Sequence, residues 1–167
     1  MLKQAFRAVP VIGIIVAVAL STASCHHVDN RRLTGAAANL LFRTQAEWIT
    51  YGPSGAGDWR VFNRQERIPA DFPYIVSSMT GLGGLLVCTT YLGDEIAYDM
   101  ACPVECRRDI TVFINDDRLA ECIKCHSTYD VFSLPGSPVS GEAAEKGYGL
   151  QIYHVSPGRN GEYRVIY

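Results

Sequence analysis

The sequence predicts a small, antiparallel, all-β domain, and two observations lead to this prediction. Short runs of apolar and β-branched residues recur from residue 74 onward, and turn-forming residues separate them. Two of the separating segments, residues 92–95 and residues 115–117, contain the glycine, aspartate or asparagine that tight turns favour, so each predicts a β-hairpin. The expected strands cover residues 85–91, 96–100, 110–114, 119–123, 128–132, 150–155 and 163–167.

Length, charge and composition narrow the class of protein. A chain of 167 residues is long enough for one domain with a core, and its 48% hydrophobic content excludes wholesale disorder. The 15 basic and 17 acidic side chains give a net charge of -2, which offers no electrostatic footprint for nucleic acid. The six cysteines are the unusual feature, so function is to be sought in what they bind.

Residues 1–24 have the features of a signal peptide. A basic start precedes an apolar stretch at residues 9–20, which is shorter than the roughly 20 residues that span a bilayer. Small residues then precede Cys25, and this site resembles a bacterial lipoprotein processing site, although Thr22 stands where leucine is usual. The resemblance implies export, lipidation of Cys25 and anchoring to a bacterial membrane. Ordinary secretory cleavage, with Cys25 left as a free thiol or lost, is the alternative.

The segment after the signal peptide divides into a tether and the start of the domain. Residues 25–35 combine the lipidated cysteine with a polar stretch that is typical of a spacer, and a single domain is expected over residues 36–167. Helix-forming residues after Thr34 predict a short helix within residues 36–49. The glycine-rich residues 81–84 predict a β-turn, because a strand rather than a helix follows them.

Four cysteines form two closely spaced pairs, Cys102 with Cys106 and Cys122 with Cys125, joined by the second predicted hairpin. Two tight turns can present thiolates at these separations toward one centre, as in zinc ribbons and rubredoxin-like sites. Soft sulfur ligands select zinc, iron or an iron–sulfur centre. Two structural disulfides, or a redox dithiol at the second pair, are alternatives in an exported protein. Cys88 lies inside an apolar strand and is expected to be a buried core residue.

The sequence around the second pair resembles the second half of a Rieske-type iron–sulfur domain. Residues 122–130 (CIKCHSTYD) are similar to the family's ligand loop, residues 136–138 (GSP) to the loop that covers its cluster, and residues 150–155 (LQIYHV) to the following strand. Residues 97–103 (AYDMACP) resemble the entry to the first ligand loop. The resemblance covers about residues 82–167, and it extends to exported Rieske-like lipoproteins that lack the cluster histidines.

The resemblance implies a ligand set, residue by residue. Cys102 and Cys122 match the family's cysteine ligands directly. Cys125 stands where the second loop of the family has its histidine, and Val104, which cannot ligate, stands at the histidine of the first loop. Cys106 is the next donor in the first loop. The expected ligands are therefore four cysteines in place of two cysteines and two histidines.

The resemblance also implies supporting residues and a cofactor. Ser127 and Tyr129 match the residues whose hydroxyls hydrogen-bond the cluster sulfur and a ligand sulfur in the family, and the metal-binding part would cover about residues 98–141. A [2Fe-2S] cluster held by four thiolates is expected nearer the plant-type potential of about -400 mV than the Rieske range of roughly -150 to +300 mV. The same thiolates also suit a single zinc or iron ion, and the short spacing favours that alternative.

These patterns predict a membrane-anchored, Rieske-like iron–sulfur protein that transfers electrons to another redox protein. No catalytic constellation accompanies the cysteines, and four thiolates would leave no open coordination position for a substrate. The alternative is a binding lipoprotein without redox activity, stabilised by a structural zinc ion or by disulfides.

Overall fold

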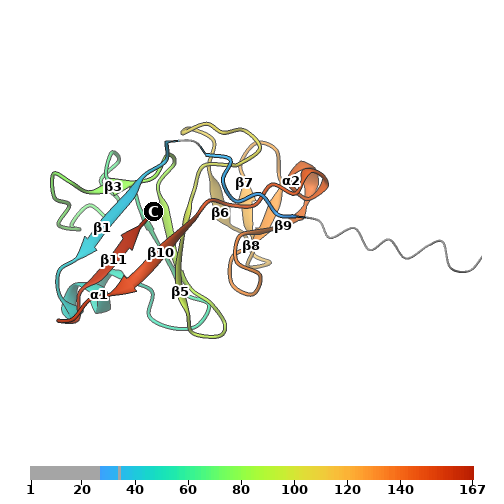
Figure 1. The fold of residues 1–167 in the computed structure, drawn as a ribbon. Coiled ribbons are helices and arrows are strands. Elements are labelled where there is room, and N and C mark those ends of the chain that lie inside the picture. Colours follow the sequence, from blue (N-terminus) through green and yellow to red (C-terminus); the bar gives the residue numbers. More distant parts are fainter. Residues whose placement is uncertain (1–26, 34) are drawn as a thin grey trace, which may run out of the picture.

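The computed structural model describes residues 27–33 and 35–167, and these form two antiparallel sheets (Figure 1). The strands are β1 (Ala38–Phe42), β2 (Trp59–Phe62), β3 (Met79–Thr80), β4 (Leu85–Thr89), β5 (Glu95–Asp99), β6 (Val112–Ile114), β7 (Ala120–Cys122), β8 (Thr128–Asp130), β9 (Ser137–Ser140), β10 (Ile152–Pro157) and β11 (Tyr163–Ile166). The helices are α1 (Gln45–Tyr51) and α2 (Gly141–Lys146). The all-β fold class that the sequence predicted is confirmed.

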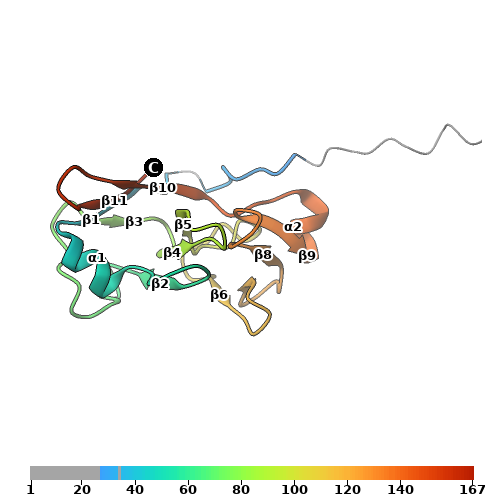
Figure 2. The same cartoon turned by 90° about the horizontal axis from the view of Figure 1, so that it is seen from below.

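The small sheet is an insertion into the larger one. The larger sheet has the strand order β2-β4-β5-β10-β11-β1-β3, and the smaller has the order β6-β7-β8-β9. Strands β5 and β10 pair directly, yet all of the small sheet and α2 lie between them in the sequence. The inserted lobe sits at one end of the larger sheet (Figures 1 and 2). Both cysteine pairs belong to this lobe.

Both predicted hairpins are present. Strands β4 and β5 pair with Leu86 opposite Tyr98, and β6 and β7 pair with Val112 opposite Cys122. The turns match the local sequence signals, because Gly93 has a positive φ of 94° and the side chain of Asn115 accepts a hydrogen bond from the backbone of Leu119. The strands predicted near residues 128–132, 150–155 and 163–167 correspond to β8, β10 and β11.

Strand β4 is buried on both faces, which explains its unbroken apolar sequence. Leu85 and Val87 pack in one core with aromatic residues of the larger sheet, including Phe42. Leu86 and Cys88 face the other way and pack in a second core shared with the small sheet. The second core therefore joins the two sheets, and the cysteines of the inserted lobe are part of it.

The helix predicted within residues 36–49 is wrong in its first half. Residues 38–42 form strand β1, in which Ala38, Leu40 and Phe42 are buried and the residues between them are not, a period of two. The helix α1 starts only after Thr44, whose side chain accepts a hydrogen bond from the backbone N–H of Glu47. The cap expected at Thr34 lies outside the described residues.

Residues 27–33 are part of the folded domain, in contrast to the polar spacer that the sequence suggested. The backbone of Asp29 donates to the carbonyl of Gly147 at 2.7 Å and accepts from the N–H of Gly149 at 2.9 Å. Leu33 is buried in a small apolar cluster.

The predicted signal peptide and Cys25 lie outside the described residues. Within the described ranges, no helix has the length and apolar character needed to cross a bilayer.

The glycine-rich turn before β4 holds a buried carboxylate. Backbone N–H groups of Leu82, Gly83 and Ala101 donate to the carboxylate of Asp99 at 2.6 to 2.9 Å, and the hydroxyl of Tyr153 donates at 2.8 Å. The predicted turn is present, and its backbone N–H groups bind the carboxylate of Asp99. These contacts fix the end of β5 immediately before the first cysteine pair.

Candidate metal centre

Three of the four predicted ligand sulfurs converge. The Sγ atoms of Cys102, Cys122 and Cys125 all lie within 4.8 Å of one another, and the pair from Cys102 and Cys125 is separated by 3.6 Å. In a tetrahedral thiolate site with metal–sulfur bonds of about 2.3 Å, the sulfurs are about 3.8 Å apart. The three side chains therefore have the spacing of ligands to one ion.

Strand β6 brings the two turns together. The residue before β6, Thr111, forms an antiparallel bridge with Ala101, and the N–H of Cys102 donates to the carbonyl of Ile110 at 2.9 Å. The other side of β6 pairs with β7, which places Val112 opposite Cys122. Because one short strand contacts both segments, cysteines 20 positions apart in sequence meet in space.

The two turns have the same backbone geometry. In the first, the N–H of Cys106 donates to the carbonyl of Cys102 at 2.8 Å, and in the second the N–H of His126 donates to the carbonyl of Cys122 at 3.2 Å. The fifth residue is left-handed in both, with φ of 50° at Cys106 and 55° at His126. In the second turn the N–H of Lys124 also points at the Sγ of Cys122, 3.5 Å away. Both turns are thus closed by the same backbone hydrogen bond, and the second is closed around the sulfur of its first cysteine.

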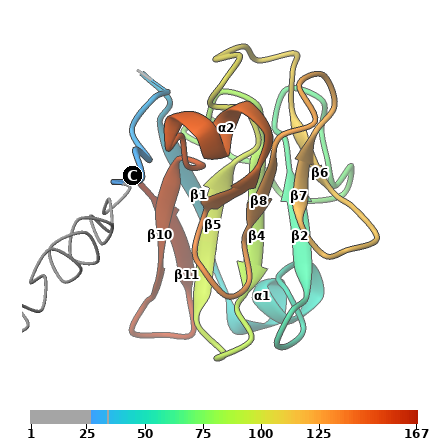
Figure 3. The same ribbon diagram turned by 90° about the vertical axis from the view of Figure 1, so that its right-hand side faces the viewer.

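The two predicted hydroxyl residues contact the sulfurs. The hydroxyl of Tyr129 lies 3.6 Å from the Sγ of Cys102, and the Oγ of Ser127 lies 3.4 Å from the Sγ of Cys125. Ser127 also accepts a hydrogen bond from the N–H of Ala143 in α2, at 3.2 Å. Both hydroxyl residues are fully buried. Helix α2 lies against β8 in the inserted lobe (Figure 3).

The sulfurs differ in their readiness to lose a proton. Burial raises the pKa of Cys102 from 9.0 to about 12, although hydrogen bonds from backbone amides and Tyr129 oppose the shift. Burial also acts to raise the pKa of Cys125, but hydrogen bonds with the hydroxyl and the backbone of Ser127 outweigh it and hold the pKa below its ordinary value. The sulfur of Cys102 must therefore release a proton when a metal ion binds, and the sulfur of Cys125 gives up its proton more readily than that of Cys102.

Cys106 is not brought into this group. Its side chain is exposed, and its Sγ donates to the carbonyl of Pro103 at 3.2 Å. The guanidinium of Arg32 lies 3.9 Å from the same sulfur and stacks on the ring of Tyr148 at 3.8 Å. The N-terminal segment therefore contacts the outer side of the first turn, where Cys106 points.

The remaining cysteine and the disulfide alternatives can be placed as well. Cys88 is fully buried in β4, as expected of a core residue, and burial raises its pKa. The five cysteines of the described residues are free thiols, so neither alternative disulfide is formed in this structure.

Sequence reasoning did not single out Glu105 in the first turn. Only 17% of its side chain is exposed, and its Oε2 accepts from the Nζ of Lys124 in the second turn at 2.6 Å. The signal that could have revealed it is the position it shares with Cys125, since each is the fourth residue of its turn. The ion pair links the two turns.

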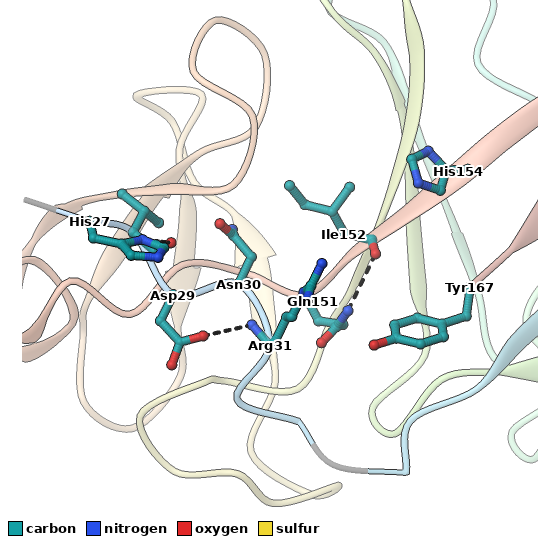
Figure 4. Close-up of a pocket in the computed structure, with 9 residues that line it drawn as sticks. His27, Asp29, Asn30, Arg31, Gln151, Ile152, His154 and Tyr167 are labelled. Atoms are coloured by element: carbon teal, nitrogen blue, oxygen red, sulfur yellow. Dashed lines mark hydrogen bonds between the residues drawn. The ribbon is translucent and has the colours of Figure 1, made fainter.

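A cavity among the described residues is separate from the sulfurs. It has a volume of about 860 Å³ and lies between the N-terminal segment and β10, where Figure 4 shows His27, His154 and Tyr167 on its wall. Its polar contacts are local, such as the bond from the N–H of Arg31 to Asp29. The cysteines do not line it.

Comparisons of the chain with protein-family models, curated proteins and solved structures gave no match. Function must therefore be argued from the chemistry of the converging sulfurs.

Proposed function

We propose that this protein is an electron-transfer module in which Cys102, Cys122 and Cys125 bind a single iron ion. The observation that carries the proposal is the mutual approach of three sulfurs to within 4.8 Å, from two turns that are far apart in the sequence. Bound iron would supply a one-electron couple, and the residues of the chain would hold it and set its potential.

The sulfur spacing favours one ion over the [2Fe-2S] cluster that the family resemblance suggested. In a two-iron cluster, ligands on different irons are held apart by the bridging core, whereas ligands on one iron share an edge of a tetrahedron. Cys125 occupies the place of a histidine on the second iron, yet its Sγ is only 3.6 Å from that of Cys102. A cluster would require Cys125 to move outward.

The surroundings of the sulfurs support a redox role. Hydrogen bonds to ligand sulfurs and limited solvent exposure are features by which proteins set the potential of iron–sulfur sites. Tyr129 and Ser127 supply hydroxyls to two of the sulfurs. Cys102 and Cys122 are buried while Cys125 is partly exposed, which offers an electron a short path to the surface.

A structural zinc ion is the second candidate, and the dimensions of the inserted lobe favour it. Strands β6, β7 and β8 have three residues each, so the lobe has few backbone hydrogen bonds of its own. A metal that closes two turns stabilises such a lobe, because the free energy of metal binding adds to that of folding.

Metal analysis and visible absorption of anaerobically purified protein test the proposal. We expect one iron per chain and a sulfur-to-iron charge-transfer band that dithionite bleaches. Two irons with two inorganic sulfides would show a cluster instead. A colourless protein with one zinc ion would establish the structural role and reject electron transfer.

We also propose that the protein is exported and held at a bacterial membrane by a lipid on Cys25, where it meets its redox partner. The support is the sequence of residues 1–25. Expression in bacteria fed with labelled palmitate should label the wild-type chain and leave Cys25→Ala unlabelled. Label in both chains, or in neither, would reject the anchor.

A further inference from the structure

The two turns of the metal centre are alike in backbone but not in the residue at their fourth position. Both are closed by a hydrogen bond from the fifth N–H to the first carbonyl, and both have a left-handed fifth residue. The fourth residue is Cys125 in the second turn and Glu105 in the first. We propose that the carboxylate of Glu105, and not the thiol of Cys106, is the fourth ligand of the metal.

The direction of each side chain follows from the backbone. In the second turn the fourth residue, Cys125, points its sulfur at the centre, while the fifth, His126, is 73% exposed and pairs with Glu121 at the surface. The first turn repeats this pattern at its fifth residue. Cys106 is exposed, and its Sγ donates a hydrogen bond to the carbonyl of Pro103. To ligate, Cys106 would have to leave this carbonyl and turn inward, a direction that the equivalent residue of the second turn, His126, does not take.

Glu105 links the two turns beside the centre. Its carboxylate is not among the ligand atoms that lie within 4.8 Å of one another, so the side chain must turn inward from Lys124 to ligate. Its carboxylate is mostly covered and contacts Lys124, the residue whose N–H points at the Sγ of Cys122. This ion pair uses Oε2, so Oε1 is available to a metal. Lys124 is 58% exposed and can retain Oε2 or withdraw into solvent.

A carboxylate is chemically suited to this position. Aspartate and glutamate oxygens bind zinc at about 2.0 to 2.2 Å, together with thiolates at about 2.3 Å. Three thiolates and one carboxylate carry the same charge as four thiolates, so the net charge of the ligand set is unchanged. The inference rests on the proposed metal centre and specifies its ligands as three sulfurs and one oxygen.

The test uses Zn²⁺ as the probe, bound to the full chain. We expect X-ray absorption of wild type to fit three sulfurs and one oxygen, and Cys106→Ser to give the same result with the same affinity. Glu105→Gln should lower the Zn²⁺ affinity by about 100-fold. Mutation of a residue outside the coordination sphere lowers metal affinity by roughly 10- to 100-fold, so the loss of a ligand is expected to reach at least the upper end of that range. Lys124→Ala is the matched control, because it breaks the ion pair and keeps the carboxylate, and its affinity should stay close to that of wild type.

Gain of function provides a second arm. Glu105→Cys should convert the site to four sulfurs in the same absorption measurement. Two results would overturn the assignment. One is four sulfurs in wild type and three in Cys106→Ser, which would make Cys106 the fourth ligand. The other is unchanged Zn²⁺ affinity in Glu105→Gln, which would mean that the oxygen ligand is a water molecule. A wild-type chain that binds no metal would reject the whole centre, an outcome distinct from binding through a different fourth ligand.

Discussion

The hydroxyl of Tyr129 lies 3.6 Å from the Sγ of Cys102, and both side chains are fully buried. The contact joins strand β8 to the first cysteine turn in the core that the two sheets share. In this apolar setting the hydroxyl is a polar group that can stabilise a thiolate at Cys102, and its hydrogen bond opposes the effect of burial on the pKa of that thiol.

Removing this hydroxyl should weaken the metal site more than the fold. We expect Tyr129→Phe to lower Zn²⁺ affinity by about tenfold, the lower end of what partners outside the coordination sphere contribute. Competition with a chelator measures the change. Tyr98→Phe is the control, because Tyr98 is equally buried but donates to the carbonyl of Val131. A similar loss of affinity in both variants would show a general effect of core damage.

Metal affinity should rise with pH. The pKa of Cys102 is raised to about 12, so its sulfur is a protonated thiol at neutral pH and must release that proton to bind. Protons therefore compete with the metal throughout the range below pH 12, and we expect affinity to increase about tenfold per pH unit for this proton alone. Chelator competition at several values between pH 6 and pH 9 checks the slope. A flat profile would contradict the assignment of Cys102 as a ligand.

Cys122→Ser should remove both metal and stability. The side chain is fully buried with its Sγ beside those of Cys102 and Cys125, and the free energy of metal binding adds to that of folding. We expect a large fall in Tm and in metal content. Cys88→Ser should keep its full metal content, because that sulfur faces the core and lies 4.0 Å from the carbonyl of Leu86. Equal metal content in wild type and Cys122→Ser would refute the site.

Ser127→Ala should destabilise the lobe even without metal. The change leaves the N–H of Ala143 at the start of α2 without its acceptor, and a buried unsatisfied donor costs about 1 to 3 kcal/mol. Urea denaturation of the metal-free chain measures the loss. Ser133→Ala, on an exposed loop, is the control and should change stability by less than about 0.5 kcal/mol. Equal stability of the two variants would argue against this contact.

Local signals in the sequence were sufficient for the hairpins. The β4–β5 and β6–β7 pairs were predictable because each turn sequence and its flanking apolar runs carry the same information as the folded turn. Strand β1 was not predictable in this way, because Ala38, Leu40 and Leu41 also favour helix. Pairing with β11 and β3 decided its conformation.

For the candidate site, the sequence by itself determined which residues carry the chemistry: two spaced cysteine pairs, with Ser127 and Tyr129 after the second. It did not determine which of these side chains face the centre. Only the tertiary structure decided that Cys102, Cys122 and Cys125 converge while Cys106 points outward beside Arg32. The physical reason is that side-chain direction depends on backbone torsion and on the pairing of β6 with both turns. Spacing along the chain encodes neither of these.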